Sequence, residues 1–204
     1  MNKAVLISIQ PKFCELIADG EKTIEVRKSK PKLETPFKVY IYCTKQGKWF
    51  FHDGLGEKQS LFQNPDTGEI KFDFAFELMC CENKYTEDNF LSGKVIGEFV
   101  CDKIEPIDVP YPAWQKDLPK KILDNACLAY AYLHYYIGSG NRCYAWHISD
   151  LVIYDKPKEL SEFINYNKHK ICLEQNCFSA DCYFCPNNAI VIRPPQSWCY
   201  VKSQ

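Results

Sequence analysis

The spacing of apolar residues predicts a strand and a helix in the N-terminal part of this chain. An apolar run from Val5 to Ile9 is typical of a short buried strand. After Pro11, apolar residues recur at helical spacing as far as Gly20, where the helix is expected to stop. These elements are therefore expected in the order strand, helix and turn.

Apolar and polar residues then alternate, which predicts a second, half-buried strand. Because side chains on a strand change faces at every residue, Ile24 and Val26 are expected to face a core. Thr23, Glu25 and Arg27 are then neighbours on an exposed opposite face. A face that combines cations, a carboxylate and a hydroxyl is suited to a polar, anionic ligand. The alternative is a solvated edge strand whose charges have no specific role.

Further patterns predict a mostly antiparallel β-barrel with peripheral helices, because the strands are short and no regular crossover helices join them. One long helix is expected from Asp117 to Gly138, and Gly97 is expected at a bulge or a close backbone approach. A polar, aromatic region with turn signals, residues 47–81, predicts an inserted hairpin region that either covers a cleft or is a loose surface excursion. Strands are expected at residues 37–44, 93–107, 143–154, 189–192 and 198–201.

Three segments together resemble the ASCH domain of the PUA-like superfamily. They are the glycine, lysine and Glu-x-Arg strand at Gly20, Lys22, Glu25 and Arg27, the segment Val95–Val100, and the segment Tyr144–Ile148. The resemblance implies an α+β fold in which a small β-barrel carries a cleft edged by the Glu-x-Arg strand. It also implies that the cleft binds RNA or a nucleotide-like small molecule.

Length, composition and charge place limits on the class of protein. A chain of 204 residues predicts a single domain, 1–204, with insertions. There is no apolar run long enough for a membrane helix and no secretory signal, so we expect a soluble, cytoplasmic protein of unknown oligomeric state. Residues 1–48 carry a net charge of +5 and the remainder −6, so the basic end is the end with the motif. This asymmetry supports binding of an anion that weakens as salt rises.

Four of the twelve cysteines form a cluster that predicts a structural zinc site. In a reducing compartment such a cluster favours metal binding over disulfides. The spacing is C-x4-C-x4-C-x2-C, at Cys172, Cys177, Cys182 and Cys185 within a cysteine-rich insertion, residues 168–188. The alternatives are that His169 replaces one cysteine ligand, or that the group consists of reduced thiols in a loop. Most of the other cysteines are expected in the core, because no local pattern supports a catalytic cysteine paired with a histidine.

The candidate ligand site combines the motif with nearby polar and aromatic side chains: Gln10, Lys12, Lys22, Glu25, Arg27, Lys28, Trp146 and His147. The planar fork of Arg27 is suited to clamping a phosphate or carboxylate, and the lysines are suited to supplying point charges. Trp146 is expected either to stack on a base or to lie in the core. His147, on the opposite face, is expected either at the surface or against the ligand.

Two other functions stay open from the sequence. The superfamily includes amidohydrolases that act on N4-acetylcytidine, and Lys22 matches their lysine, whereas Glu25 stands where they have a threonine. An enzyme using Lys22 and Glu25 on an acylated nucleoside is therefore the first alternative. The second is a protein-interaction module in which the aromatic segment from Lys48 to Phe76 docks a partner; a large exposed apolar patch there would support it.

Overall fold

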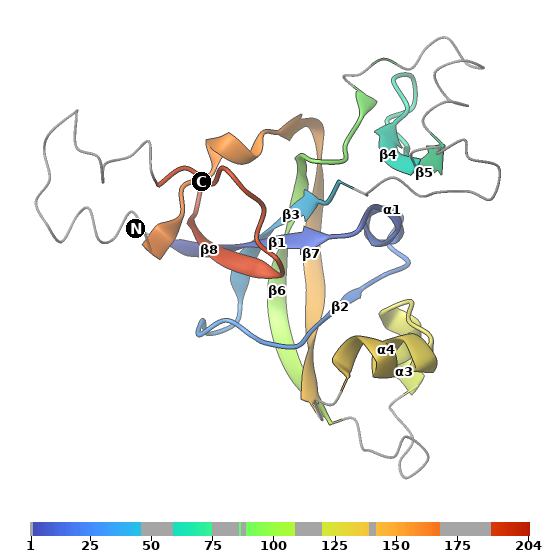
Figure 1. The fold of residues 1–204 in the computed structure, drawn as a ribbon, viewed down its shortest axis with the longest axis vertical. Coiled ribbons are helices and arrows are strands. Elements are labelled where there is room, and N and C mark those ends of the chain that lie inside the picture. Colours follow the sequence, from blue (N-terminus) through green and yellow to red (C-terminus); the bar gives the residue numbers. More distant parts are fainter. Residues whose placement is uncertain are drawn as a thin grey trace, which may run out of the picture.

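The computed structural model describes residues 2–45, 59–74, 86, 89–108, 120–138, 142–167 and 189–204 of the chain. They form a mixed α+β fold built on one six-stranded sheet (Figure 1). The elements are β1 (Lys3–Ile9), α1 (Pro11–Ala18), β2 (Ile24–Arg27), β3 (Phe37–Cys43), β4 (Gln59–Gln63), β5 (Ile70–Phe74), β6 (Val95–Asp108), α3 (Lys120–Asn125), α4 (Tyr130–Ile137), β7 (Arg142–Lys158), the 3-10 helix η3 (Leu160–Glu162) and β8 (Trp198–Lys202).

The large sheet has the strand order β2-β7-β6-β3-β1-β8 and is mostly antiparallel, with β1 and β3 as its parallel pair. Contacts between distant strands show that the sheet is strongly curved. Trp146 on β7 packs against Phe37 on β3 and against Trp198 on β8, although β7 and β8 lie four positions apart in the strand order. The prediction of a mixed α+β fold with mostly antiparallel strands is confirmed. Closure of the sheet into a barrel stays a prediction.

Gly97 lies where the long hairpin of β6 and β7 shifts register. A Cβ atom at this position would collide with the backbone carbonyl oxygen of Val152. The predicted close backbone approach at Gly97 is therefore confirmed.

The core lies on the concave side of the curved sheet, between the strands and α1. Cys14, Cys43 and Cys101 are fully buried there, as the sequence predicts for these cysteines. Burial raises the pKa of the Cys101 thiol to about 12, and burial also raises the pKa of Cys14 well above its ordinary value. These thiols stay protonated at neutral pH and act as small apolar residues.

Strand β2 is buried on both faces, which corrects the prediction of an exposed charged face. Ile24 and Val26 pack against α3, α4 and the start of β7. Glu25 and Arg27 on the other face are only 7% and 8% exposed. Both faces are covered because β2, at one end of the strand order, is folded back over the concave side of the sheet toward β1.

The helix expected from Asp117 to Gly138 is two helices in the structure, and the part before Lys120 lies outside the described residues. Cys127 adopts a left-handed φ of 51°, which ends the first helix after one and a half turns. The break leaves the carbonyl of Ala126 without its helical partner, and this group bonds to Lys22 instead. The apolar spacing therefore continues across a break that it does not reveal.

The region predicted as an inserted hairpin, residues 47–81, is described only over 59–74, where β4 and β5 form an antiparallel pair. Leu61 and Phe62 are fully buried, and the backbone N–H of Phe72 donates to Glu15 of α1. Among residues 60–73, whose side chains the structure describes, none is an exposed large apolar side chain. The docking of a partner on the segment from Lys48 to Phe76 stays a prediction.

Near the C-terminus, the strand expected at 189–192 is only an isolated bridge between Ile164 and Ile190, whereas the strand expected at 198–201 is β8. Two prolines follow at 194 and 195 and lack the N–H group that would extend the pairing. The cysteine-rich insertion, residues 168–188, lies outside the described residues. Among the described helices, none has the length and apolar character needed to cross a membrane.

Candidate functional site

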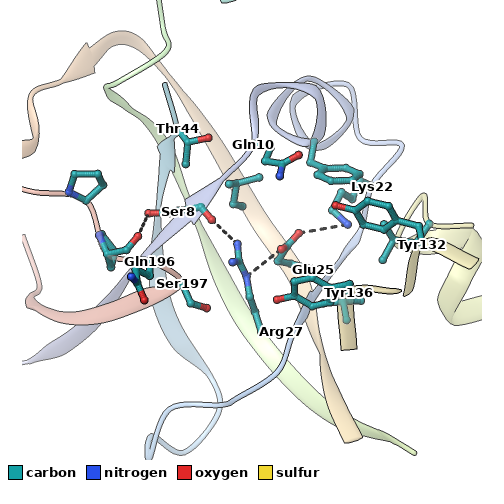
Figure 2. A pocket seen from close by; sticks show the side chains of 16 residues that line it. Ser8, Gln10, Lys22, Glu25, Arg27, Thr44, Tyr132, Tyr136, Gln196 and Ser197 are labelled. Carbon is teal, nitrogen blue, oxygen red and sulfur yellow. Dashed lines mark hydrogen bonds and ion pairs between the residues drawn. The ribbon is translucent and has the colours of Figure 1, made fainter. Parts of the chain in front are cut away.

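A cavity of about 500 Å³ lies where β2 approaches the end of β1. Its walls come from five places: the β1–α1 junction with the first turn of α1, β2 with Lys22 before it, Thr44 after β3, helix α4 with the preceding turn, and the segment 194–197 that leads into β8. Figure 2 shows the charged side chains of β2 between the polar end of β1 and the tyrosines of α4. Segments far apart in the sequence therefore converge on one site.

Lys22 lies at the floor of this cavity with 2% of its surface exposed. Its Nζ donates to the carbonyl oxygens of Ile24 at 2.8 Å and Ala126 at 2.6 Å. It also lies 3.3 Å from Glu25 Oε2, an ion pair seen in Figure 2. Three acceptors match the three N–H donors of an ammonium group, so Lys22 is fully paired and joins β2 to the turn before α4.

Arg27 is the second buried cation, and it differs from Lys22 because its pairing is incomplete. One terminal nitrogen donates to the carbonyl oxygen of Ser8 (Figure 2). This hydrogen bond connects β2 to β1, two strands that are not neighbours in the sheet. Its Nε lies 3.1 Å from Glu25 Oε1, close enough for an ion pair, but the N–H does not point at the oxygen. Among the described residues this buried Nε has no hydrogen-bond partner. A buried donor without a partner on a cavity wall is a natural contact for an acceptor on a ligand.

The charges lining the cavity sum to +1, because Lys22 and Arg27 face the single carboxylate of Glu25. All other lining side chains are uncharged. Burial strengthens the field of this excess charge, because little water is present to screen it. The site therefore favours a ligand with a negative charge.

Aromatic rings line the cavity beside the charges (Figure 2). Tyr132 and Tyr136 are one helical turn apart on α4, and Phe13 of α1 makes an edge contact with Tyr132 at a centroid distance of 6.1 Å. Burial is the main cause that raises the pKa of Tyr136, so its phenol stays protonated and can donate a hydrogen bond. Pro194 and Gln196 line the far side of the cavity. Flat apolar walls with a few hydrogen-bonding groups are suited to a planar ring.

The structure brings together four of the eight candidate residues, since Gln10, Lys22, Glu25 and Arg27 line the cavity. Lys12 and Lys28 do not line it. The Lys28 ammonium group lies 5.1 Å from the centroid of the Tyr136 ring, so it is near the rim.

Trp146 and His147 do not line this cavity. Trp146 is fully buried and packs against other aromatic rings of the core, as in the core alternative. His147 lies on the other face of β7, where its Nε2 is 2.6 Å from Glu105 Oε2. Because consecutive side chains on a strand point to opposite faces, Trp146 and His147 could not both reach one ligand site.

Three parts of the cavity wall were not among the sequence candidates. They are Ser8 of β1, the tyrosines Tyr132 and Tyr136 of α4, and the segment 194–197. Tyr132 and Tyr136 have a sequence signal, because a spacing of four places them on one helical face. From the sequence, the segment 194–197 is only the connection between the strands expected at 189–192 and 198–201. Its place beside Ser8 depends on the pairing of β8 with β1, which no local pattern reveals.

The paired state of Lys22 limits the chemistry of the site. A lysine that acts as a base or nucleophile needs a free lone pair, whereas Lys22 has all its donors directed at acceptors. The described residues contain no group of histidine, cysteine and acidic side chains able to hold a metal ion, and the four clustered cysteines lie outside them. The pairing of Lys22 therefore disfavours its use as a base or nucleophile in this arrangement.

Comparisons with known proteins identify the fold. No family model matches this chain, and no curated protein matches it. The crystal structure of ASCH from Zymomonas mobilis matches with 17% sequence identity over 98% of this chain and 87% of that chain, with a TM-score of 0.50. A mutant of the Zymomonas mobilis protein matches with 16% identity over 98% and 91% of the two chains, also with a TM-score of 0.50. The chain therefore has an ASCH-like fold.

Proposed function

We propose that this chain binds RNA or a nucleotide-like ligand in the cavity beside β2. The observation that carries the proposal is Arg27, which is buried at the cavity wall and has a donor without a hydrogen-bond partner among the described residues. A guanidinium group binds phosphate oxygens well, because its planar donors match their geometry.

The aromatic wall supports a base-binding site. The rings of Tyr132 and Tyr136 line the cavity, and base stacking on such rings contributes about 1–3 kcal/mol per base. The amides of Gln10 and Gln196 are suited to pairing with the polar edge of a base. Charge, ring surface and amides together are the features of a nucleotide site.

The cations outside the cavity support the same proposal. Lys12 and Lys28 are exposed, and neither has a carboxylate partner among the described residues. Such cations attract phosphates without reading sequence, and their contribution weakens as salt rises. Binding is therefore expected to decrease between low and physiological salt.

Titration with the four ribonucleoside 5′-monophosphates and with short single-stranded RNA tests the proposal. We expect saturable binding with one ligand per chain. Tyr132→Ala should weaken it about tenfold, as expected for the loss of one stacking surface. Tyr135→Ala is the matched control, because Tyr135 is on the same helix, is 86% exposed and does not line the cavity. Absence of binding, or equal loss in both variants, would reject the proposal.

The hydrolase alternative is tested by incubation with N4-acetylcytidine. Because the donors of Lys22 are all engaged, we expect no turnover. Turnover that disappears in a folded Lys22→Met variant would make the chain an enzyme and would overturn this expectation.

The zinc prediction extends the proposal to a part of the chain outside the described residues. Four thiolates from Cys172, Cys177, Cys182 and Cys185 would fill a tetrahedral site completely and make the metal structural. Metal analysis of the purified protein tests this, with one zinc ion per chain expected. The Cys182→Ser variant is expected to lose the zinc ion. If the protein is prepared in the presence of zinc and still contains no bound metal, the prediction is contradicted.

A further inference from the structure

We propose that the site accommodates two consecutive units of a single-stranded nucleic acid, joined by one phosphodiester. This inference rests on the proposed function and names the ligand more closely. Its basis is a second cavity, of about 400 Å³, that shares two lining residues with the first. The shared residues are Thr44, which follows β3, and Pro194, on the segment leading into β8. The two hollows are therefore adjacent, and a ligand that crosses their shared rim could occupy both.

The second cavity offers surfaces for a further base. Leu160 of η3 and Ile192 are apolar lining residues, and Ile192 is unusual because it is 75% exposed. The buried ring of Tyr42 also lines the cavity, and burial is the largest cause that raises the pKa of its phenol. This combination of apolar surface and a protonated hydroxyl resembles the wall made by the tyrosines of α4 in the first cavity.

The charges match one phosphodiester. The charged side chains among the residues that line the second cavity are one cation, Lys45, and one anion, Glu159. Their charges cancel, so the +1 contributed by Lys22, Glu25 and Arg27 is the net charge of both cavities together. A dinucleoside monophosphate carries one negative charge, whereas a free 5′-monophosphate carries about two at neutral pH.

The junction between the cavities is polar in a way that suits a phosphodiester. The backbone N–H of Thr44 donates to the carbonyl oxygen of Ile9, which fixes the position of the residue. Its side-chain hydroxyl has no hydrogen-bond partner among the described residues, although it borders both cavities. Lys45 follows directly, is exposed, and has no carboxylate partner in the described part of the chain. A hydroxyl donor and a point charge are the groups that bind a bridging phosphate.

A comparison of ligands of different length tests this inference. The sixteen ribodinucleoside monophosphates and the four ribonucleoside 5′-monophosphates are titrated into the full chain by calorimetry. The tightest dinucleoside monophosphate should bind about tenfold more tightly than the tightest mononucleotide, since a second base is stacked. Thr44→Val should remove most of this gain, so that the dinucleoside monophosphate binds the variant about as tightly as the mononucleotide does.

Two variants of the second cavity, with one control, separate the possible outcomes. Lys45→Ala and Ile192→Ala should each weaken the dinucleoside monophosphate about threefold to tenfold without changing mononucleotide binding. Lys121→Ala removes an exposed lysine that lines neither cavity and should change neither affinity.

If mononucleotides and dinucleotides bind equally, and Lys45→Ala has no effect, the inference is overturned while the proposed function stands. If neither ligand binds, the proposed function fails as well. Binding of an extended peptide in place of the dinucleotides, weakened by the same variants, would assign the second cavity to a protein partner and would also overturn the inference.

Discussion

Two charged networks lie on different faces of the sheet, and they differ in burial and in completeness. On β2, Glu25 lies between Lys22 and Arg27, and the side chains of all three are at most 9% exposed. In the second network, Glu98 Oε1 on β6 lies 2.7 Å from Lys38 Nζ on β3, and these side chains are 22% and 34% exposed, respectively. Both networks join neighbouring parts of the fold, but only the first lines a cavity.

The Glu98 network is closed, because its carboxylate also accepts a hydrogen bond from Tyr154 at 2.6 Å. Burial by itself would raise the pKa of Glu98, but the hydrogen bonds from Lys38 and Tyr154 outweigh it and lower that pKa. In the β2 network a donor of Arg27 stays unpaired and the cations exceed the carboxylates by one. Burial combined with incomplete pairing, not charge alone, marks the ligand site.

The largest expected effect is on stability, from Glu25→Ala. This change leaves two buried cations without their carboxylate, and breaking a buried pair costs about 3–5 kcal/mol of the free energy of unfolding. Urea denaturation followed by circular dichroism measures this loss. Glu98→Ala, which removes the carboxylate of the more exposed network, should cost about 1 kcal/mol or less. Similar losses in the two variants would remove the distinction between the networks.

The second effect is on binding, from Arg27→Lys. Lysine keeps the charge but lacks the planar fork and the Nε donor, so ligand affinity should fall about tenfold. Lys28→Ala, at the rim, should reduce affinity only about twofold and reduce its salt dependence. Calorimetry at two salt concentrations measures both effects. An Arg27→Lys variant with unchanged affinity would show that the guanidinium group is structural only.

The smallest expected effect is the pH dependence contributed by Glu98. Because its pKa in the folded chain lies below the ordinary value of 4.5, its contribution to stability is complete above that value and is lost as the pH falls through the folded pKa. Glu98→Gln should therefore flatten the acid limb of the stability curve below about pH 4.5. Melting temperatures from pH 3 to pH 7 measure this change. A steeper acid limb in the variant would reverse the assigned sign.

Much of the strand architecture could be predicted from local patterns. The alternation in β2 gave the correct faces for Ile24 and Val26, since a period of two needs no knowledge of the rest of the chain. It could not show that the charged face is also covered. The cover over Glu25 and Arg27 comes from the curvature of the sheet and from the segment 194–197, which is 167 or more residues away in the sequence.

The helix and the site residues show the same limit. The break at Cys127 requires a left-handed backbone at a residue whose type does not demand it, so the apolar spacing appeared continuous. From the sequence, Trp146 is expected either to stack on a base or to lie in the core, and His147 either at the surface or against the ligand. The register of β7 places one in the core and the other beside Glu105. β6 and β7 pair over a long stretch in which the register shifts several times. The register of such a strand pair depends on tertiary packing.

The most direct test of the account follows the Nε–H group of Arg27 by NMR during titration with a nucleotide. The Nε–H signal of Arg27 is assigned by its absence from the spectrum of the Arg27→Lys variant. It reports on the one buried donor without a hydrogen-bond partner among the described residues of the cavity wall. The account predicts that this signal shifts, is protected from exchange, and saturates with the dissociation constant measured by calorimetry. A signal that stays unchanged while the nucleotide binds would place the ligand elsewhere and contradict the account.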